Sequence, residues 1–139
     1  MTKEFWLSLP VKSLARSKEF FTSLGFSFTP GPGNTDTSAP LMIGNKNVVV
    51  MLFEEAFFKG CTNNEIADTS KVTEVLLSFD AESREEVDEI ANKAVAAGGT
   101  LFGKPSEVQG WMYSCGFTDL DGHRWNVLYM DMNKVQKCQ

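Results

Sequence analysis

One order of elements occurs twice in this chain of 139 residues, and the repetition limits the folds that are open to it. Each copy contains the pattern of a strand, a helix and three further strands, and each helix ends at glycine, Gly25 or Gly98. Leu7-Ser8-Leu9 and Leu77-Ser78-Phe79 stand at the same point of the two copies, about seventy residues apart. Helices this few and this short cannot cover both faces of a sheet. The pattern therefore predicts an α+β fold, a curved and cupped mixed sheet with its helices outside and its inner face open.

In the first copy, residues 5–10 are predicted to form a strand with Trp6 and Ser8 on one face. Residues 13–24 have the helical period. Their apolar stripe consists of Leu14, Phe20, Phe21 and Leu24. Further strands are expected at residues 26–29, 41–43 and 47–53, and the last two should form a hairpin that turns at residues 44–46. The intervening residues 30–40, rich in proline and glycine, are predicted to form a loop.

In the second copy, residues 74–79 are predicted to form a strand, and Ser83 with Glu86 has the spacing of a helix capping box. The apolar stripe of this helix is Val87, Ile90, Ala91, Ala94 and Val95. A short strand is expected at residues 100–102, and a hairpin at 110–117 and 125–130, with Asp121-Gly122 in its turn. Along the last strand, Trp125, Val127 and Tyr129 alternate with Asn126, Leu128 and Met130.

The repeat predicts a single domain over residues 1–139, built from approximate modules 4–54 and 72–131. The connector, residues 55–71, is irregular, with one helical turn expected around residues 55–59. Its exposed-looking aromatics, Phe57 and Phe58, either pack the connector onto the core or contact a ligand as a lid.

Composition narrows the classes of partner. An apolar content of 42% supports a packed interior. With a net charge of −5 and no basic run, the chain is not expected to bind nucleic acid. The longest apolar run, residues 48–53, is too short to span a membrane, and the first residues lack a signal-peptide pattern. Three widely spaced cysteines, Cys61, Cys115 and Cys138, argue against a disulfide framework and favour a cytoplasmic location.

Several segments in this order resemble the vicinal oxygen chelate superfamily, which includes glyoxalase I, extradiol dioxygenases, and bleomycin and fosfomycin resistance proteins. The segments that carry the resemblance are Leu9-Pro10-Val11, Ser17-Lys18-Glu19-Phe20-Phe21, Leu24-Gly25-Phe26, Glu74-Val75-Leu76-Leu77-Ser78-Phe79-Asp80, Ala96-Ala97-Gly98-Gly99 and Phe117-Thr118-Asp119-Leu120-Asp121-Gly122-His123. The match covers about residues 4–131, and small bacterial glyoxalase-like proteins are the most similar members. The resemblance implies two βαβββ modules side by side and, for chains this short, a homodimer.

Metal-dependent members of that superfamily hold a divalent ion with four inward-pointing His, Glu or Gln side chains, on the first and last strands of each module. The matching positions here are Trp6, Met51, Glu74 and Asn126. An indole offers a metal no lone pair, and a thioether suits soft ions rather than Ni, Zn, Fe or Mn. One carboxylate and one amide are too few ligands for a catalytic dication. The residues therefore predict no metal site and no cofactor.

Other chemical groups in the sequence are interpreted as structural. His123, the single histidine, lies beside the Asp121-Gly122 turn and is expected to be a turn residue rather than a general base. Cys115 is expected to be a buried small hydrophobe, not a nucleophile. Asp119 and Asp121 are turn-forming residues, and too few carboxylates follow them for a calcium loop.

If alternation holds in all the strands, a mainly apolar pocket should be lined by Trp6, Ser8, Met51, Phe53, Glu74, Leu76, Asn126 and Leu128. Glu74 is the candidate catalytic residue. Among apolar neighbours its pKa would be raised by desolvation. It could pair with a cationic ligand above an aromatic face, or act as a general base in a metal-free proton shift. Alternatively, it hydrogen-bonds Ser8 or Asn126 and closes a core.

Three functions follow from these observations. The first is a metal-free protein that binds a small organic ligand, cationic or aromatic, as a homodimer. The second is a divalent-metal-dependent lyase, isomerase or dioxygenase whose site is completed by a partner subunit. The third is a structural or regulatory dimer with a filled pocket.

Overall fold

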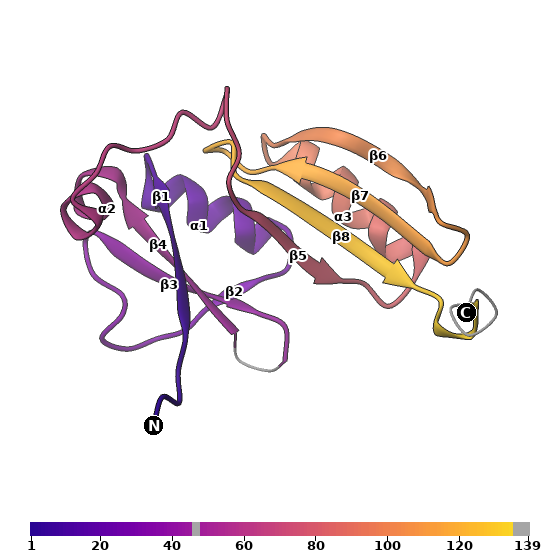
Figure 1. Ribbon diagram of the computed structural model, residues 1–139, viewed down its shortest axis with the longest axis horizontal. Coiled ribbons are helices and arrows are strands. Elements are labelled where there is room, and N and C mark those ends of the chain that lie inside the picture. The colour runs from indigo at the N-terminus through magenta and orange to yellow at the C-terminus, as the bar shows by residue number, and fades with distance from the viewer. Residues whose placement is uncertain (46–47, 135–139) are drawn as a thin grey trace. The chain divides into compact units, whose positions relative to one another are not determined.

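The computed structural model describes residues 1–45 and 48–134, and the chain forms two compact units, Met1–Val72 and Thr73–Gln139 (Figure 1). Each unit is described by itself. In both, a four-stranded mixed sheet carries a helix on one face, so the predicted α+β fold of two βαβββ modules is confirmed. No helix in the described part of the chain is long and apolar enough to cross a membrane.

The first unit contains six elements in the order strand, helix, three strands, helix. Their bounds are β1 (Trp6–Val11), α1 (Leu14–Ser23), β2 (Ser27–Phe28), β3 (Ser38–Ile43), β4 (Val48–Glu54) and α2 (Glu55–Thr62). The strands lie in the order β1-β4-β3-β2, with β1 parallel to β4 and the other pairs antiparallel. A parallel pair needs a long crossover, and here α1, β2 and β3 supply it.

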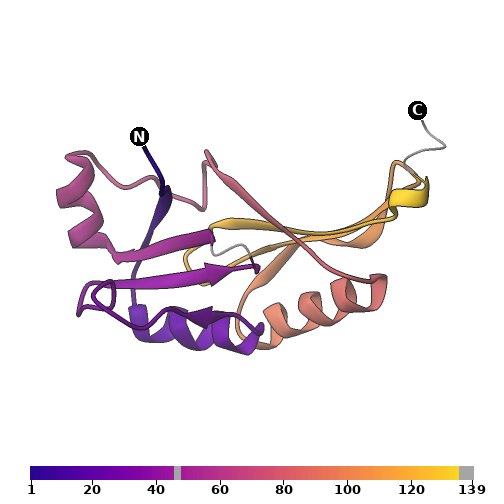
Figure 2. The same ribbon diagram turned by 90° about the horizontal axis from the view of Figure 1, so that it is seen from below.

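The core of the first unit lies between its sheet and α1, which runs along one face of the strands in Figure 2. Leu9 and Val11 of β1 are buried there, as are Val50 and Leu52 of β4. The alternate residues of the same strands point to the opposite face, which α1 does not cover. Ser13 caps α1 by accepting a hydrogen bond from the backbone N–H of Arg16.

The second unit repeats this arrangement. Its elements are β5 (Leu76–Asp80), α3 (Arg84–Ala96), β6 (Thr100–Val108), β7 (Met112–Thr118) and β8 (Arg124–Met130), and the strands lie in the order β5-β8-β7-β6. Its core contains an aromatic cluster in which the Phe117 and Trp125 rings stack at 6.3 Å and Phe79 meets both edge-on. Four residues of the predicted stripe on α3 are buried, namely Val87, Ile90, Ala91 and Ala94, whereas Val95 is half exposed.

The predicted alternation of the last strand is confirmed for its buried face. Trp125 and Val127 are buried on the side of α3, and Asn126 and Leu128 are more exposed on the other side. The turn before this strand is built on Asp119, whose Oδ1 accepts hydrogen bonds from the backbone N–H groups of Asp121 and His123. Asp119 is therefore a turn-forming residue, as predicted.

Several predicted boundaries are corrected. Glu74 lies outside any strand, because β5 begins only at Leu76. The strand predicted at residues 100–102 extends to Val108, since two register shifts let it pass Gly103 and Pro105 and remain paired with β7. The single turn expected at residues 55–59 is a helix that ends at Thr62, and part of the turn expected at 44–46 lies outside the described residues.

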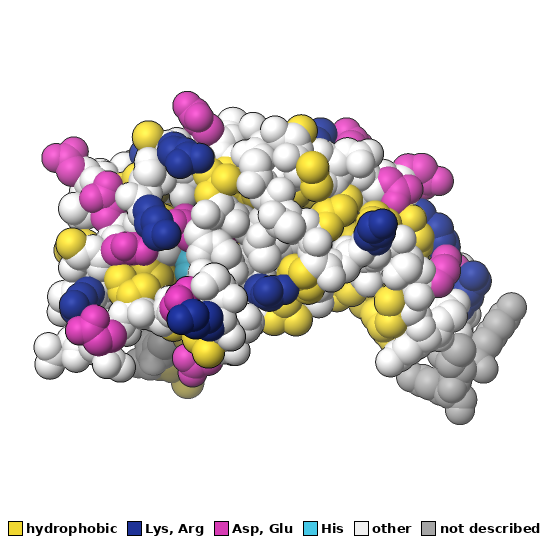
Figure 3. Space-filling model, turned by 90° about the horizontal axis from the view of Figure 1, so that it is seen from above, with side chains coloured by type: hydrophobic (Ala, Val, Ile, Leu, Met, Phe, Trp, Pro, Cys, Tyr) yellow, Lys and Arg dark blue, Asp and Glu magenta, His cyan; other side chains and the backbone are white. Residues whose placement is uncertain are grey.

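On the face shown in Figure 3, acidic and basic side chains are interspersed, and hydrophobic side chains also reach the surface. The exposed large hydrophobic residues include Phe5, Trp6, Val75 and Leu76, which lie in or beside the edge strands β1 and β5.

Candidate ligand-binding pocket

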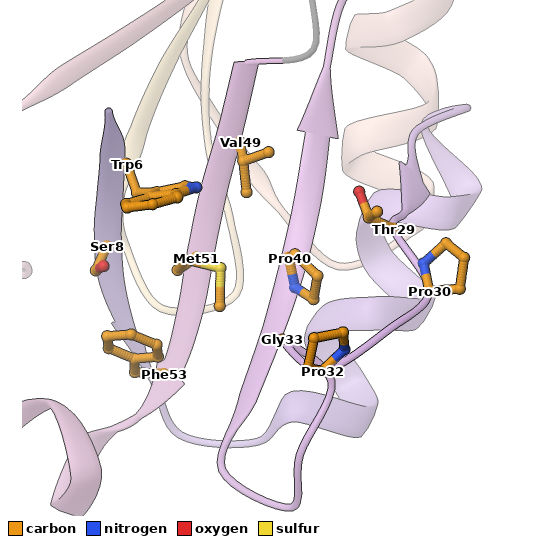
Figure 4. A pocket seen from close by; sticks show the side chains of 10 residues that line it. All are labelled: Trp6, Ser8, Thr29, Pro30, Pro32, Gly33, Pro40, Val49, Met51 and Phe53. Carbon is orange, nitrogen blue, oxygen red and sulfur yellow. The ribbon is translucent and has the colours of Figure 1, made fainter. Parts of the chain in front are cut away.

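The uncovered face of the first sheet carries a pocket (Figure 4). In the parallel register of β1 and β4, Ser8 lies opposite Met51, and Trp6 lies opposite Val49. Residues two apart in a strand point to the same side, so these side chains share the face opposite the core. Phe53 continues this row on β4. The side chains thus form one aromatic and thioether wall.

The second wall comes from the start of the loop that was predicted at residues 30–40, together with β3. Its residues are Thr29, Pro30, Pro32, Gly33 and Pro40. Hydrogen bonds tie the loop to itself and to β3. The Thr29 N–H donates to the Pro40 carbonyl at 3.0 Å, and the Ser38 hydroxyl donates to the Gly33 carbonyl at 2.7 Å. Proline fixes its own backbone angle φ, so this wall is stiff before any ligand arrives.

Gly33 lies close to the strands β3 and β4. A Cβ atom at this position would lie 3.4 Å from the Pro40 Cγ and 3.8 Å from the Met51 Cε, so a larger side chain would project toward the pocket. Behind the first wall, the Phe53 ring packs edge-on against Phe57 of α2, with ring centroids 4.9 Å apart. Phe57 thus packs the start of the connector against a pocket-lining side chain rather than against the core, and it stays 43% exposed.

The cavity has a volume of ≈480 Å³, within the range of small-molecule sites. None of the residues that line it carries a charge. Its polar side chains are Ser8 and Thr29, and the Thr29 hydroxyl is buried without a hydrogen-bond partner among the described residues. Trp6 is 58% exposed, an unusual state for the largest side chain, and a ligand stacked on it would remove apolar surface from water. The pocket is therefore suited to a flat apolar or aromatic molecule.

The structure brings four of the eight predicted lining residues together in this pocket: Trp6, Ser8, Met51 and Phe53. The other four belong to the second unit. Glu74 is exposed ahead of β5, and Leu76, at the start of that strand, is 52% exposed. Asn126 lies between Ser78 and Gly116, and Leu128 lies between Asp80 and Ser114.

Sequence reasoning missed the proline wall and Val49. The signal for the wall was present, since three prolines and two glycines fall between residues 30 and 40. Their composition predicted a loop, which is correct up to Thr37, but residues 38–40 belong to β3 because they pair with β4. The side on which the loop folds back depends on Thr29 pairing with Pro40, a contact that periodicity does not encode.

The residues that the resemblance matches to the superfamily's metal ligands do not fit a divalent ion. Trp6 and Met51 line the apolar pocket, and Glu74 and Asn126 are the only oxygen donors among the four. Within residues 1–45 and 48–134, no three His, Cys, Asp or Glu side chains gather in a group that could hold a metal. At the four matched positions, the donor chemistry thus differs from the His, Glu and Gln set that the resemblance implies.

The remaining reactive groups have structural surroundings. Cys115 is buried, its thiol faces the Val87 carbonyl of α3, and burial raises its pKa to about 11. Burial also raises the pKa of Asp119 above its usual value, while the charge of His123 and the hydrogen bond from the Trp125 indole oppose that shift. Cys61 is exposed near the end of α2, and Cys138 lies outside the described residues.

Comparison with known proteins gives matches among solved structures, whereas no family model and no curated protein matches the chain. A hypothetical protein, SA1046 from S. aureus, is 32% identical over 92% of this chain and 94% of its own, with a TM-score of 0.81. A glyoxalase/bleomycin resistance protein/dioxygenase family enzyme from Burkholderia phytofirmans PsJN is 18% identical over 88% and 94% of the two chains, with a TM-score of 0.71.

The genomically encoded fosfomycin resistance protein FosX from Listeria monocytogenes is 18% identical and has a TM-score of 0.70, with 100% of this chain and 99% of FosX covered. At this level of identity, the similarity to FosX and to the Burkholderia enzyme concerns the fold.

Proposed function

Because the chain belongs to the vicinal oxygen chelate superfamily, which contains the glyoxalase, bleomycin resistance and dioxygenase proteins, we propose that it binds a small organic molecule in the pocket of its first module without a metal. The observation that carries this proposal is the identity of two pocket residues. The resemblance matches Trp6 and Met51 to positions where metal-dependent members place ligands, and both contribute apolar surface to a cavity of ≈480 Å³.

The chemistry of the walls favours an aromatic ligand. Aromatic rings and a thioether pack well on a flat π-system, and a wall of prolines loses little conformational entropy when it closes on one. The Ser8 hydroxyl supplies a hydrogen bond that could orient the molecule. No charged side chain of the first module lines the cavity, so affinity for this part of the site should come from apolar contact rather than from ion pairing.

We further propose that Glu74, Leu76, Asn126 and Leu128 of the second unit contribute to ligand binding, and that the Glu74 carboxylate favours a cationic group. Support for this role comes from the place of Glu74 in the superfamily pattern and from its exposed carboxylate, which keeps it available for pairing. An exposed pair of this kind contributes modestly, on the order of 1 kcal/mol or less. The Glu74 carboxylate should therefore tune selectivity rather than create affinity.

A matched pair of aromatic probes tests the pocket. We expect acridine and N-methylacridinium both to quench tryptophan fluorescence on binding, and Trp6→Ala to weaken both about tenfold or more. Phe5→Ala is the control, because Phe5 precedes Trp6, is 81% exposed and does not line the cavity. Glu74→Gln should weaken the binding of N-methylacridinium and leave the binding of acridine unchanged. Equal affinity of wild type and Trp6→Ala for both probes would refute the pocket proposal.

Titration calorimetry tests the proposal that the protein binds its ligand without a metal. Ni²⁺, Zn²⁺ and Mn²⁺ added to the metal-stripped protein should give no heat of specific binding. Micromolar or tighter binding that is lost in Glu74→Gln would instead favour the alternative, a metal-dependent lyase, isomerase or dioxygenase. Metal binding that Glu74→Gln leaves unchanged would place the ion elsewhere on the surface and would leave the pocket proposal standing.

A further inference from the structure

The uncovered face of the second sheet has a charged centre. Since Trp125 and Val127 of β8 are buried against α3, the residues between and beside them, Arg124 and Asn126, point to the other face. In the sheet register, Arg124 lies between Leu76 and Thr118, and Asn126 lies between Ser78 and Gly116. Polar groups on three neighbouring strands thus surround one arginine.

Phe102 forms a platform on this face. It lies at a register shift of β6, between Leu101 and Gly103, and its ring covers Gly116. A Cβ atom on Gly116 would lie 2.4 Å from the Phe102 Cε2, which is inside van der Waals contact. Only glycine leaves room for the ring here, so the absence of a side chain at residue 116 is what seats Phe102 on the sheet.

The Arg124 guanidinium lies over that ring, with its Cζ atom 4.6 Å from the ring centroid. A cation above an aromatic face is stabilised by the ring quadrupole, and stacking also fixes the plane of the guanidinium. The Nε atom of Arg124 is buried without a hydrogen-bond partner, and Arg124 forms no ion pair with any residue that the structure describes. The stacked guanidinium is thus held flat, and no carboxylate of the described residues pairs with it.

Arg84, on the other side of the same unit, shows which partner Arg124 lacks. Its guanidinium also lies over aromatic rings, at 5.9 Å from Tyr113 and 5.2 Å from Tyr129. In contrast to Arg124, its Nε donates to the Glu107 carboxylate at 2.8 Å. Both arginines lie over aromatic rings, and among the residues that the structure describes only Arg84 has a carboxylate partner.

We propose that the uncovered face of the second sheet binds a carboxylate-bearing small molecule, with Arg124 as its anchor. The guanidinium presents a flat set of N–H donors that matches the two oxygens of a carboxylate. The Asn126 side chain, about 7 Å along β8, and the Ser78 hydroxyl beside it offer further hydrogen bonds to the same molecule. This inference does not rest on the pocket of the first module, because every residue it uses belongs to the second.

Charge makes the site selective. The chain has a net charge of −5, so anions are repelled in general and would gather only at a local donor. The carboxylate of Asp80 shares the face but pairs with Leu128 in the register, four residues along β8 from Arg124 and so about 13 Å away. At that distance salt screens most of its effect on the guanidinium.

Nitrogen-edited NMR of the full-length protein tests the site directly, because each arginine gives an Nε–H signal. The probes are phenylacetate and its neutral isostere phenylacetamide, with inorganic phosphate at matched ionic strength. We expect phenylacetate to shift the Arg124 Nε–H signal in a saturable way, while phenylacetamide leaves it in place. The signal of Arg16, on the exposed surface of α1, is the internal control and should not move.

Variants then test whether the affinity for phenylacetate depends on Arg124. Arg124→Gln should weaken phenylacetate binding at least tenfold, and Arg124→Lys should lose most of it, because an ammonium keeps the charge without the flat donor set. Arg16→Gln should leave binding unchanged. Unaltered affinity in a folded Arg124→Gln protein would overturn the proposal. If that variant does not fold, the wild-type spectra decide. An Arg124 signal that ignores phenylacetate, or that responds only to phosphate, would also overturn the carboxylate assignment.

Discussion

At the scale of single residues, Asp119 connects the last turn to the core of the second unit. Its carboxylate accepts three hydrogen bonds, from the Trp125 indole at 3.0 Å and from the backbone N–H groups of Asp121 and His123 at 2.9 and 3.1 Å. Burial raises the pKa of this carboxyl, while the charge of His123 and the three hydrogen-bond donors oppose that rise.

We predict that Asp119→Ala lowers the free energy of unfolding by about 3 kcal/mol, because three donors lose a shared acceptor in a buried site. Urea denaturation followed by tryptophan fluorescence measures this change. Asp121→Ala is the control, since Asp121 enters the turn through its backbone N–H in this network. A loss below about 1 kcal/mol for Asp119→Ala would mean that other groups replace the carboxylate.

Cys115 illustrates a second consequence of burial. Its pKa of about 11 leaves about one thiol in a thousand ionised at pH 8, and the thiolate is the form that reacts. We predict that iodoacetamide labels Cys61 of the native protein readily at pH 8 and spares Cys115 until the chain unfolds, as peptide mass mapping can show. Rapid native labelling of Cys115 would reveal local opening between β7 and α3.

At the scale of elements, the two main helices start with the same residue type but not with the same network. Ser13 accepts one hydrogen bond from the Arg16 N–H at 3.3 Å. Ser83 accepts one from the Glu86 N–H at 3.1 Å, and the Glu86 carboxylate in turn accepts one from the Glu82 N–H at 3.2 Å. Helix α3 therefore has a reciprocal cap of the kind predicted from Ser83 and Glu86. It differs from the standard capping box in one respect, because the Glu86 carboxylate accepts from the N–H of Glu82 rather than from that of Ser83.

We predict that Ser83→Ala lowers the free energy of unfolding by about 1 kcal/mol. Ser83→Asp should restore the stability, because aspartate is an equally good cap and suits the positive end of the helix dipole. Thermal unfolding monitored by circular dichroism gives both values. If Ser83→Asp were as unstable as Ser83→Ala, the serine would act through something other than its cap.

At the scale of the whole molecule, each sheet ends in an edge strand with exposed apolar side chains. Trp6 on β1 is 58% exposed and Leu76 on β5 is 52% exposed. Exposed apolar edges favour association with another chain. We therefore expect the homodimer that the resemblance implied. We predict that the dimer interface includes these edge strands and does not include the outer surface of α3.

Sedimentation equilibrium measures this prediction. Wild type should show twice the mass of one chain, and Leu76→Lys should shift the population toward monomer. Val95→Lys, a matched change at a 50% exposed residue of α3, should leave the dimer intact. A monomeric wild type would contradict the prediction, and dissociation by Val95→Lys alone would place the interface on the helix.

Local pattern in the sequence was enough to predict the order of elements and most of their inward faces. The period of two in β8 places Trp125 and Val127 in the core, and the period of the helix places Val87 and Ile90 there. Both patterns act within a few residues, because an apolar side chain is stabilised wherever its own strand or helix turns it inward. The resemblance to the superfamily followed from the same local segments.

Tertiary structure alone decided which groups meet on the uncovered faces. Pro40 reaches the pocket because β3 pairs with β4, and Phe102 reaches Arg124 because β6 shifts its register beside β7. Glu74, the residue that sequence reasoning placed at the centre, lies ahead of β5 rather than in it. These contacts join residues that are distant in sequence, and their free energy depends on register, bulges and loop closure, which no local period encodes.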